Sequence, residues 1–206
     1  MDAYQTLKQK GTSEYIEKKS RFIGVAVPVQ TEQQALSFLQ EVKKQYPDAR
    51  HHVYAYMLRQ DNKQRYSDDG EPQGTAGLPV LEILKNQNLT DCAIVVTRYF
   101  GGTLLGTGGL VRAYSTAAKE AVEASQIVTA SRAALCSVQC DYRQYSLVQS
   151  VLLGHAAVLT QTDFLDTVQM RFYIQTQKLK ALKDQLTEAT AGTVTISQEK
   201  EEFMFF

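Results

Sequence analysis

The chain has 206 residues, 44% of them hydrophobic and 21% charged, so it is long enough for two domains and has the composition of a globular protein. Its 22 basic and 22 acidic side chains cancel, so any surface that binds nucleic acid must be a local patch. No apolar run is long enough to span a membrane, no signal-peptide core is present, and the three cysteines lack the spacing of a zinc site. We therefore expect a cytoplasmic protein without a bound metal or cofactor and without membrane association.

The first domain is expected to open with residues 14–30, where alternating apolar residues from Ile23 to Val29 predict a strand. A basic cluster precedes this alternation and contains Lys18, Lys19 and Arg21. It is either a solvated strand end or a contact for an anion. Residues 31–46 then predict a helix with Thr31 as its cap.

Residues 51–58 predict a strand that begins with two histidines. Neighbouring residues of a strand point to opposite faces, so His51 and His52 are not expected to bind one metal ion together. One of the two side chains could instead reach the glycine-rich segment described below, as a proton-transfer or phosphate-contacting group.

An acidic turn follows, with Asp68, Asp69 and Glu71 close to Gly70 and Pro72. Three carboxylates this close repel one another unless something neutralises them. They could cap the helix predicted to begin near Leu78, bind Mg²⁺ together with phosphate oxygens, or pair with Arg98 or Arg112 further along the chain. The sequence leaves these three interpretations open.

Residues 93–97 predict a buried strand, and residues 110–125 predict a helix. Between them lies a segment rich in glycine, which permits positive φ or the close approach of another group. Its glycines are Gly101, Gly102, Gly106, Gly108 and Gly109, and Arg98 and Arg112 flank it. The segment lacks the Walker and dinucleotide-binding patterns. It indicates either an anion-binding surface or tight packing of the helix on the sheet.

The strand pattern restarts near residue 133, which divides the chain into predicted domains 1–131 and 132–206. Predicted strands, helices and strands follow in the order β-α-β-β-α-β, which is the ferredoxin-like arrangement. The aromatic signature of RNA-recognition motifs is missing from these strands.

Four ordered blocks of the first domain resemble the IMPACT family, in particular its bacterial YigZ-like branch. They are residues 18–24, 49–56, 67–77 and 96–114. The resemblance implies an α+β fold, with an N-terminal α/β sandwich like domain IV of elongation factor G, of the ribosomal-protein domain-2 type. It implies a C-terminal domain like domain V of that factor. Eukaryotic members of the family are linked to translational control, through a partner of the kinase that senses amino-acid starvation. Those members carry an additional protein-binding domain that this chain lacks.

The leading hypothesis is a translation-associated regulatory protein that contacts RNA or the ribosome. The phosphate contacts would come from Lys18, Lys19, Arg21, Arg50, Arg98 and Arg112, with backbone N–H groups of the glycine-rich segment. A rival hypothesis is a Mg²⁺-dependent enzyme acting on a phosphorylated small molecule or nucleotide. A third is a protein-interaction module without a ligand. The resemblance supplies no catalytic residues, so the sequence leaves open whether the protein is an enzyme, and the oligomeric state is equally open.

Overall fold

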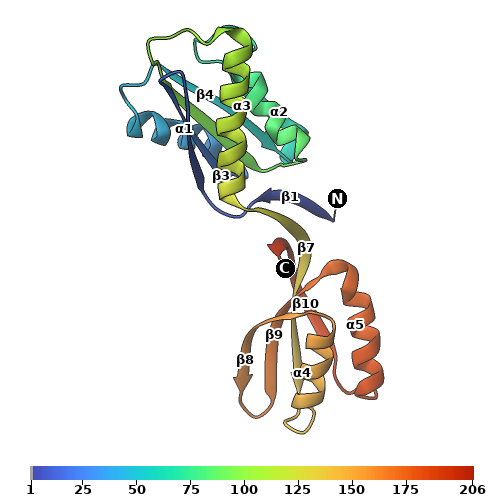
Figure 1. The fold of residues 1–206 in the computed structure, drawn as a ribbon. Coiled ribbons are helices and arrows are strands. Elements are labelled where there is room, and N and C mark those ends of the chain that lie inside the picture. Colours follow the sequence, from blue (N-terminus) through green and yellow to red (C-terminus); the bar gives the residue numbers. More distant parts are fainter. Residues whose placement is uncertain (1) are drawn as a thin grey trace. The chain divides into compact units, whose positions relative to one another are not determined.

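The computed structural model describes residues 2–206 and divides into two units (Figure 1). One unit spans residues 4–129, and the other spans residues 130–206 together with residues 2 and 3. Each unit combines helices with a β-sheet, which confirms the expected α+β class. Within the described residues, no helix has the length and apolar character needed to cross a membrane.

The unit of residues 4–129 has nine elements. They are β2 (Gly11–Glu17), β3 (Ser20–Pro28), α1 (Glu32–Gln45), β4 (His51–Leu58), the short 3₁₀ helix η1 (Gln60–Asn62), β5 (Lys63–Ser67), α2 (Gly77–Asn86), β6 (Cys92–Tyr99) and α3 (Gly106–Ser125). Two strands include the boundary between the units, β1 (Ala3–Leu7) and β7 (Ile127–Cys140). The remaining elements are α4 (Tyr145–Gly154), β8 (Val158–Phe164), β9 (Val168–Gln175), α5 (Thr176–Ala189) and β10 (Ile196–Phe205).

The first unit is built on an antiparallel sheet with the strand order β2-β3-β6-β4-β5. Helices cover both of its faces, because β6 is apolar on both sides: every residue from Cys92 to Arg98 is buried. Helix α1 packs on one face through Phe38 and Leu39. Helices α2 and α3 pack on the other, where Tyr114 is fully buried (Figure 1). Thr31 caps α1 in a capping box with Gln34, as the sequence predicts.

One expectation for this unit is wrong, the start of its last helix. The basic cluster does lie at an exposed strand end, where Lys18 and Lys19 form a two-residue turn between β2 and β3. Both have positive φ, 46° and 66°, as tight hairpin turns require, but neither is the glycine or asparagine that usually signals such a turn. Helix α3 begins at Gly106 and not at Leu110, so three of the five glycines lie in its first turn. Because glycine disfavours helix, the sequence pattern does not indicate that the helix begins at Gly106.

The second unit has the β-α-β-β-α-β order that the sequence predicts, in an antiparallel sheet where β7 pairs with β10 and β9, and β9 pairs with β8. Helices α4 and α5 cover one face and pack on alternate residues of β7 and β9. Polar side chains on β9 and β10 pair with one another. Arg171 lies 3.2 Å from Glu199, and the Tyr173 hydroxyl donates to Glu202.

Candidate functional site

One end of the first sheet gathers the segments that the sequence singles out. In the strand register, Arg98 of β6 lies opposite Phe22 of β3 on one side and opposite His51 of β4 on the other. The β2–β3 turn, the start of β4 and the glycine-rich segment after β6 therefore all lie at this end, which is also where α3 begins. Residues as far apart in sequence as Ser20 and Gly101, which are separated by 81 positions, are close in space because the three strands are neighbours.

A buried ion pair lies just inside this end. The Nη1 atom of Arg98 donates to Oε1 of Glu71 at 2.7 Å, and the Tyr114 hydroxyl donates to the same oxygen at 2.7 Å. Arg98 is 6% exposed and Glu71 is 9% exposed. Burial and then the hydrogen bond to Glu71 raise the pKa of the Tyr114 hydroxyl, so it remains a donor at neutral pH. Of the three interpretations of the acidic turn, pairing with an arginine therefore applies to Glu71.

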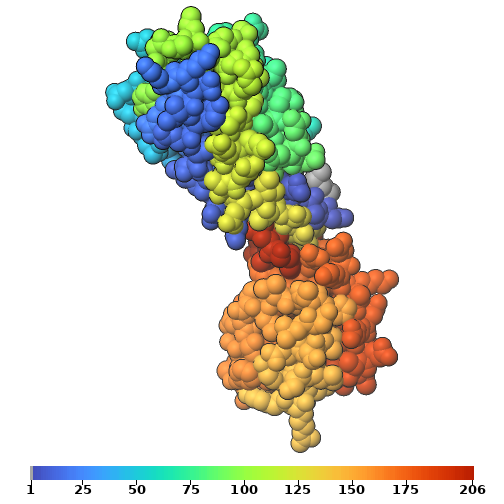
Figure 2. Space-filling model, viewed as in Figure 1, coloured from blue at the N-terminus to red at the C-terminus, as the bar shows by residue number. Residues whose placement is uncertain are grey.

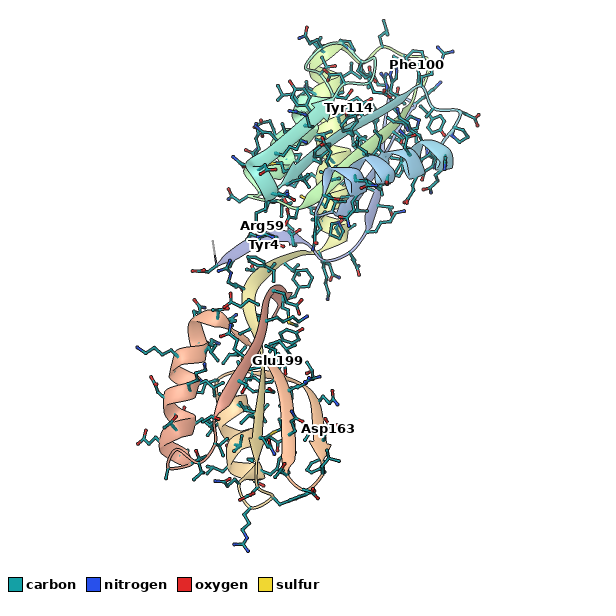
Figure 3. All side chains as sticks on the ribbon, turned by 180° about the vertical axis from the view of Figure 1, so that it is seen from behind. Tyr4, Arg59, Phe100, Tyr114, Asp163 and Glu199 are labelled. Atoms are coloured by element: carbon teal, nitrogen blue, oxygen red, sulfur yellow. The ribbon has the colours of Figure 1, made fainter. Side chains whose placement is uncertain are left out.

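Two aromatic rings lie against the Arg98 guanidinium. Its central carbon is 5.5 Å from the ring centroid of Phe22 and 5.6 Å from that of Phe100. Phe22 is completely buried and meets Tyr114 edge-on, whereas Phe100 is 56% exposed. Figure 3 labels Phe100 at this end of the unit, with Tyr114 further inside. The buried charge is thus covered on its outer side by a ring that itself faces solvent.

The other two carboxylates of the acidic turn have different partners. Asp68 accepts hydrogen bonds from the backbone N–H groups of Gly74, Ala76 and Gly77, at 2.9, 3.1 and 2.7 Å, and so caps the start of α2. Asp69 accepts from the backbone N–H of His52 at 2.6 Å and lies 3.8 Å from the Lys43 ammonium. Helix capping therefore applies to Asp68, and ion pairing to Glu71.

Both histidines have hydrogen-bond partners in this turn or in β6. Nδ1 of His51 lies 2.8 Å from the carbonyl oxygen of Asp69, and Nδ1 of His52 lies 3.1 Å from the Thr97 hydroxyl. Burial lowers the pKa of His52, which favours its neutral form. Across residues 2–206 no group of three or more His, Cys, Asp or Glu side chains is arranged to hold a metal ion.

Gly101 joins the glycine-rich segment to the β2–β3 turn. Its amide donates to the Ser20 hydroxyl at 3.1 Å. A Cβ atom on Gly101 would lie 2.0 Å from the carbonyl carbon of Lys19, far inside van der Waals contact. Only glycine allows the two backbones to approach this closely. The packing interpretation of the glycines thus applies to Gly101, and this packing places Lys18 and Lys19 beside the exposed part of the segment.

The start of α3 carries backbone donors and a cation. Its first N–H groups, from Gly106 to Gly108, have neither a side-chain cap nor a backbone acceptor in the described part of the chain. Exposed Arg112 extends back over this turn, because a Cβ on Gly108 would lie 3.7 Å from its guanidinium. A hollow of about 320 Å³ beside Arg112 is lined by Tyr15 and Glu17 of β2 and by Gly109 and Thr116 of α3. Figure 2 shows the blue β2–β3 segment next to the yellow-green surface of α3.

The six predicted phosphate-contacting cations fall into two groups. Arg98 is neutralised by Glu71, and Arg21 makes a two-point contact with Glu14 at 2.7 and 2.8 Å. The other four lie at the surface with no carboxylate within ion-pair distance in residues 2–206: Lys18, Lys19, Arg50 and Arg112. We call the surface made of these four residues, Phe100 and the segment 101–109 the basic end.

Sequence reasoning gave Phe100 no role. A signal for it was present, since Phe100 directly follows β6 and continues the alternation of Ile94, Val96 and Arg98, with burial lost only at Phe100.

Known proteins match both units. A model described as the Impact N-terminal domain matches residues 18–122, which include the whole basic end and are about half of the chain. The chain belongs to the IMPACT family. A second model, described as a domain of unknown function (DUF1949), matches residues 138–193.

Two bacterial members of the IMPACT family resemble the chain over most of its length, and a eukaryotic member resembles less than half of it. The IMPACT family member YvyE of Bacillus subtilis is 36% identical over 199 residues, covering 96% of this chain and 92% of YvyE. The member YigZ of Escherichia coli is 34% identical over 184 residues, covering 87% and 89%. Protein IMPACT of Bos taurus is 32% identical over 94 residues, which are 44% of this chain and 30% of that protein. A crystal structure titled as that of a hypothetical protein superposes with a TM-score of 0.62 at 30% identity, covering 98% of this chain and all of the other.

Proposed function

We propose that this protein contacts RNA, free or in the ribosome, through the basic end, and that it acts as a translation-associated regulatory protein. The observation that carries the proposal is the contact of Gly101 with the backbone of Lys19. Because of it, the lysines of the β2–β3 turn and the uncapped N–H groups of α3 belong to one surface. Lys18, Lys19 and Arg112 would contact phosphates, and the N–H groups of the first turn of α3 would donate to phosphate oxygens.

The distribution of charge supports this choice of surface. The chain has no net charge, so binding cannot rest on a general basic excess. The four cations of the basic end have no carboxylate partner within the described chain. Unneutralised cations release counterions when they meet phosphates, which is the main source of affinity for nucleic acid.

The likeness of the two units to domains IV and V of elongation factor G, and a cytoplasmic location, are parts of the same proposal. The β-α-β-β-α-β order of the second unit is consistent with the first part. Arg98 has a different role here from the other cations. It is expected to support the surface from inside through Glu71 and Phe100, and not to contact phosphate.

Binding to single-stranded RNA oligonucleotides and to purified ribosomes, measured over a series of salt concentrations, tests the proposal. The variants are Lys18→Gln, Lys19→Gln and Arg112→Gln. Each should weaken binding and reduce the slope of log K against log salt by roughly 0.7–1, the amount expected for one lost phosphate contact.

Lys180→Gln is the matched control, because Lys180 is an exposed lysine of α5 with no carboxylate within ion-pair distance among the described residues. It makes the same change of charge in the other unit and should leave the slope unchanged. Binding that is absent, that does not depend on salt, or that responds equally to Lys180→Gln would reject the proposal.

A further inference from the structure

We infer that Phe100 is a stacking platform for an unpaired base, so that the RNA bound at the basic end is single-stranded. This inference rests on the proposed function and names the kind of RNA that the surface accepts. It starts from the most exposed aromatic side chain of the basic end: Phe100 is 56% exposed and lies between strand β6 and Gly101.

The ring is exposed because of where β6 ends. Phe100 continues the face of β6 that carries Ile94, Val96 and Arg98, which are 0%, 0% and 6% exposed. Helix α3 covers these three positions. After Phe100 the chain leaves the sheet at Gly101 and Gly102, and α3 begins only at Gly106. The Phe100 ring, at the end of this row of side chains, is therefore not covered by α3.

The inner face of the ring has firm support. The guanidinium of Arg98 lies 5.6 Å from the Phe100 centroid, an arrangement that the negative face of the ring favours. Arg98 is held by the hydrogen bond to Glu71, and Glu71 is held in turn by Tyr114 of α3. A platform whose position is fixed in advance loses little entropy when a base stacks on it.

The surroundings of the ring match the two parts of a nucleotide. Proteins that bind single strands combine aromatic side chains, on which bases stack, with cations that follow the backbone. The basic end supplies such cations: Lys18 and Lys19, placed by the contact of Lys19 with Gly101, and Arg112 in the first turns of α3. A duplex offers phosphates to these cations but keeps its bases stacked within the helix, so it cannot use the ring.

A hydrophobic protein partner would use the same segment differently. Leu104 is 83% exposed, more than Phe100, and lies in the same glycine-rich segment. An apolar contact from a protein would bury both side chains, whereas stacking of a base needs the flat ring alone. The two side chains therefore give a matched pair for an experiment.

The experiment measures binding of a 12-nucleotide single strand without self-complementarity, roughly the length that one such binding surface covers, and of the same strand annealed to its complement. The proteins are wild type, Phe100→Leu, Phe100→Tyr and Leu104→Ala. Phe100→Leu should weaken single-strand binding roughly 5- to 140-fold, the factor that corresponds to loss of one stacked base. It should leave duplex binding and the salt slope unchanged. Phe100→Tyr and Leu104→Ala should bind like wild type.

The outcomes separate this inference from the proposed function. If Phe100→Leu leaves single-strand binding unchanged while Lys19→Gln still weakens it, the stacking role is wrong and the basic surface remains. If Leu104→Ala weakens binding as much as Phe100→Leu does, the contact is a general apolar one and stacking is again rejected. Equal losses for single strand and duplex would also overturn it. Circular dichroism of Phe100→Leu checks that the fold is retained. If this variant does not fold, Phe100→Tyr takes its place: weaker binding by Phe100→Tyr, with wild-type binding by Leu104→Ala, rejects stacking.

Discussion

Arg98 and Glu71 form a buried ion pair at 2.7 Å that joins the end of β6 to the acidic turn before α2. Each is the other's only carboxylate or guanidinium partner within the described residues. Tyr114 adds a donor from α3, so three segments of the unit meet at one carboxylate oxygen. Because Phe100 covers the guanidinium, the same pair supports the exposed surface above it.

Glu71→Ala is expected to destabilise the first unit by about 3–5 kcal/mol, because it leaves the Arg98 charge buried without a partner. Tyr114→Phe removes only one hydrogen bond to a charged acceptor and should cost about 1.5–3 kcal/mol. Urea unfolding followed by circular dichroism measures both. Glu14→Ala is the control, since it breaks the exposed pair with Arg21 and should hardly change the midpoint. A midpoint shift for Glu71→Ala as small as that of Glu14→Ala would contradict the role assigned to the buried pair.

The sequence predicts the elements of the first unit better than their contacts. Residues 32–45 and 51–58 form the helix and strand that periodicity indicates. For the acidic turn, however, capping and pairing with an arginine were equally compatible with the residues, and both occur, at Asp68 and Glu71. Which carboxylate takes which role depends on the distance from the turn to β6, and that distance follows from strand order, which local pattern does not encode.

The basic end shows the same limit. Its cations and glycines are visible in the sequence, but the contact that unites them is not. This contact requires the tight turn at Lys18 and Lys19. The turn contains neither the glycine nor the asparagine that usually indicates such a turn in a sequence. Arg98 and Arg112 are equivalent flanking charges in the sequence, yet the alternation along β6 buries the first, and the helical position of the second exposes it.

Gly101→Ala is expected to displace the β2–β3 turn, because the new methyl group would lie 2.0 Å from the Lys19 backbone. Overpacking of this kind costs about 1–3 kcal/mol. Gly102→Ala is the matched comparison: it has open space around it and a φ of +84°, so it should cost about 1–2 kcal/mol from backbone strain alone. Hydrogen exchange distinguishes the two, with faster exchange in β2 and β3 expected for Gly101→Ala only. Identical exchange in β2 and β3 for both variants would show that the close approach is dispensable.

The stability of the first unit should fall as the pH is lowered below about 6.5, the ordinary pKa of histidine. Burial lowers the pKa of His52 in the folded state. The unfolded chain therefore binds a proton at a higher pH than the folded chain, so the stabilisation is complete above the unfolded pKa and is lost as the pH falls toward the folded one. The urea midpoint at several values between pH 5.5 and 7.5 measures this slope. His52→Gln should flatten it, and His155→Gln, in the second unit, should not. An unchanged slope in His52→Gln would assign the pH dependence to another group.

Asp68→Ala should destabilise the start of α2, because Gly74, Ala76 and Gly77 would each lose the acceptor of their backbone N–H group. Loss of a helix cap costs about 0.5–2 kcal/mol, and the additional N–H in the turn places this variant at the upper end. Asp68→Asn keeps one side-chain oxygen, so it should lose only part of this stability, as measured by thermal unfolding. Millimolar Mg²⁺ should not raise the wild-type midpoint, since both Asp68 oxygens already accept hydrogen bonds. A midpoint that rises with Mg²⁺ in wild type but not in Asp68→Asn would instead favour a cation site at the acidic turn.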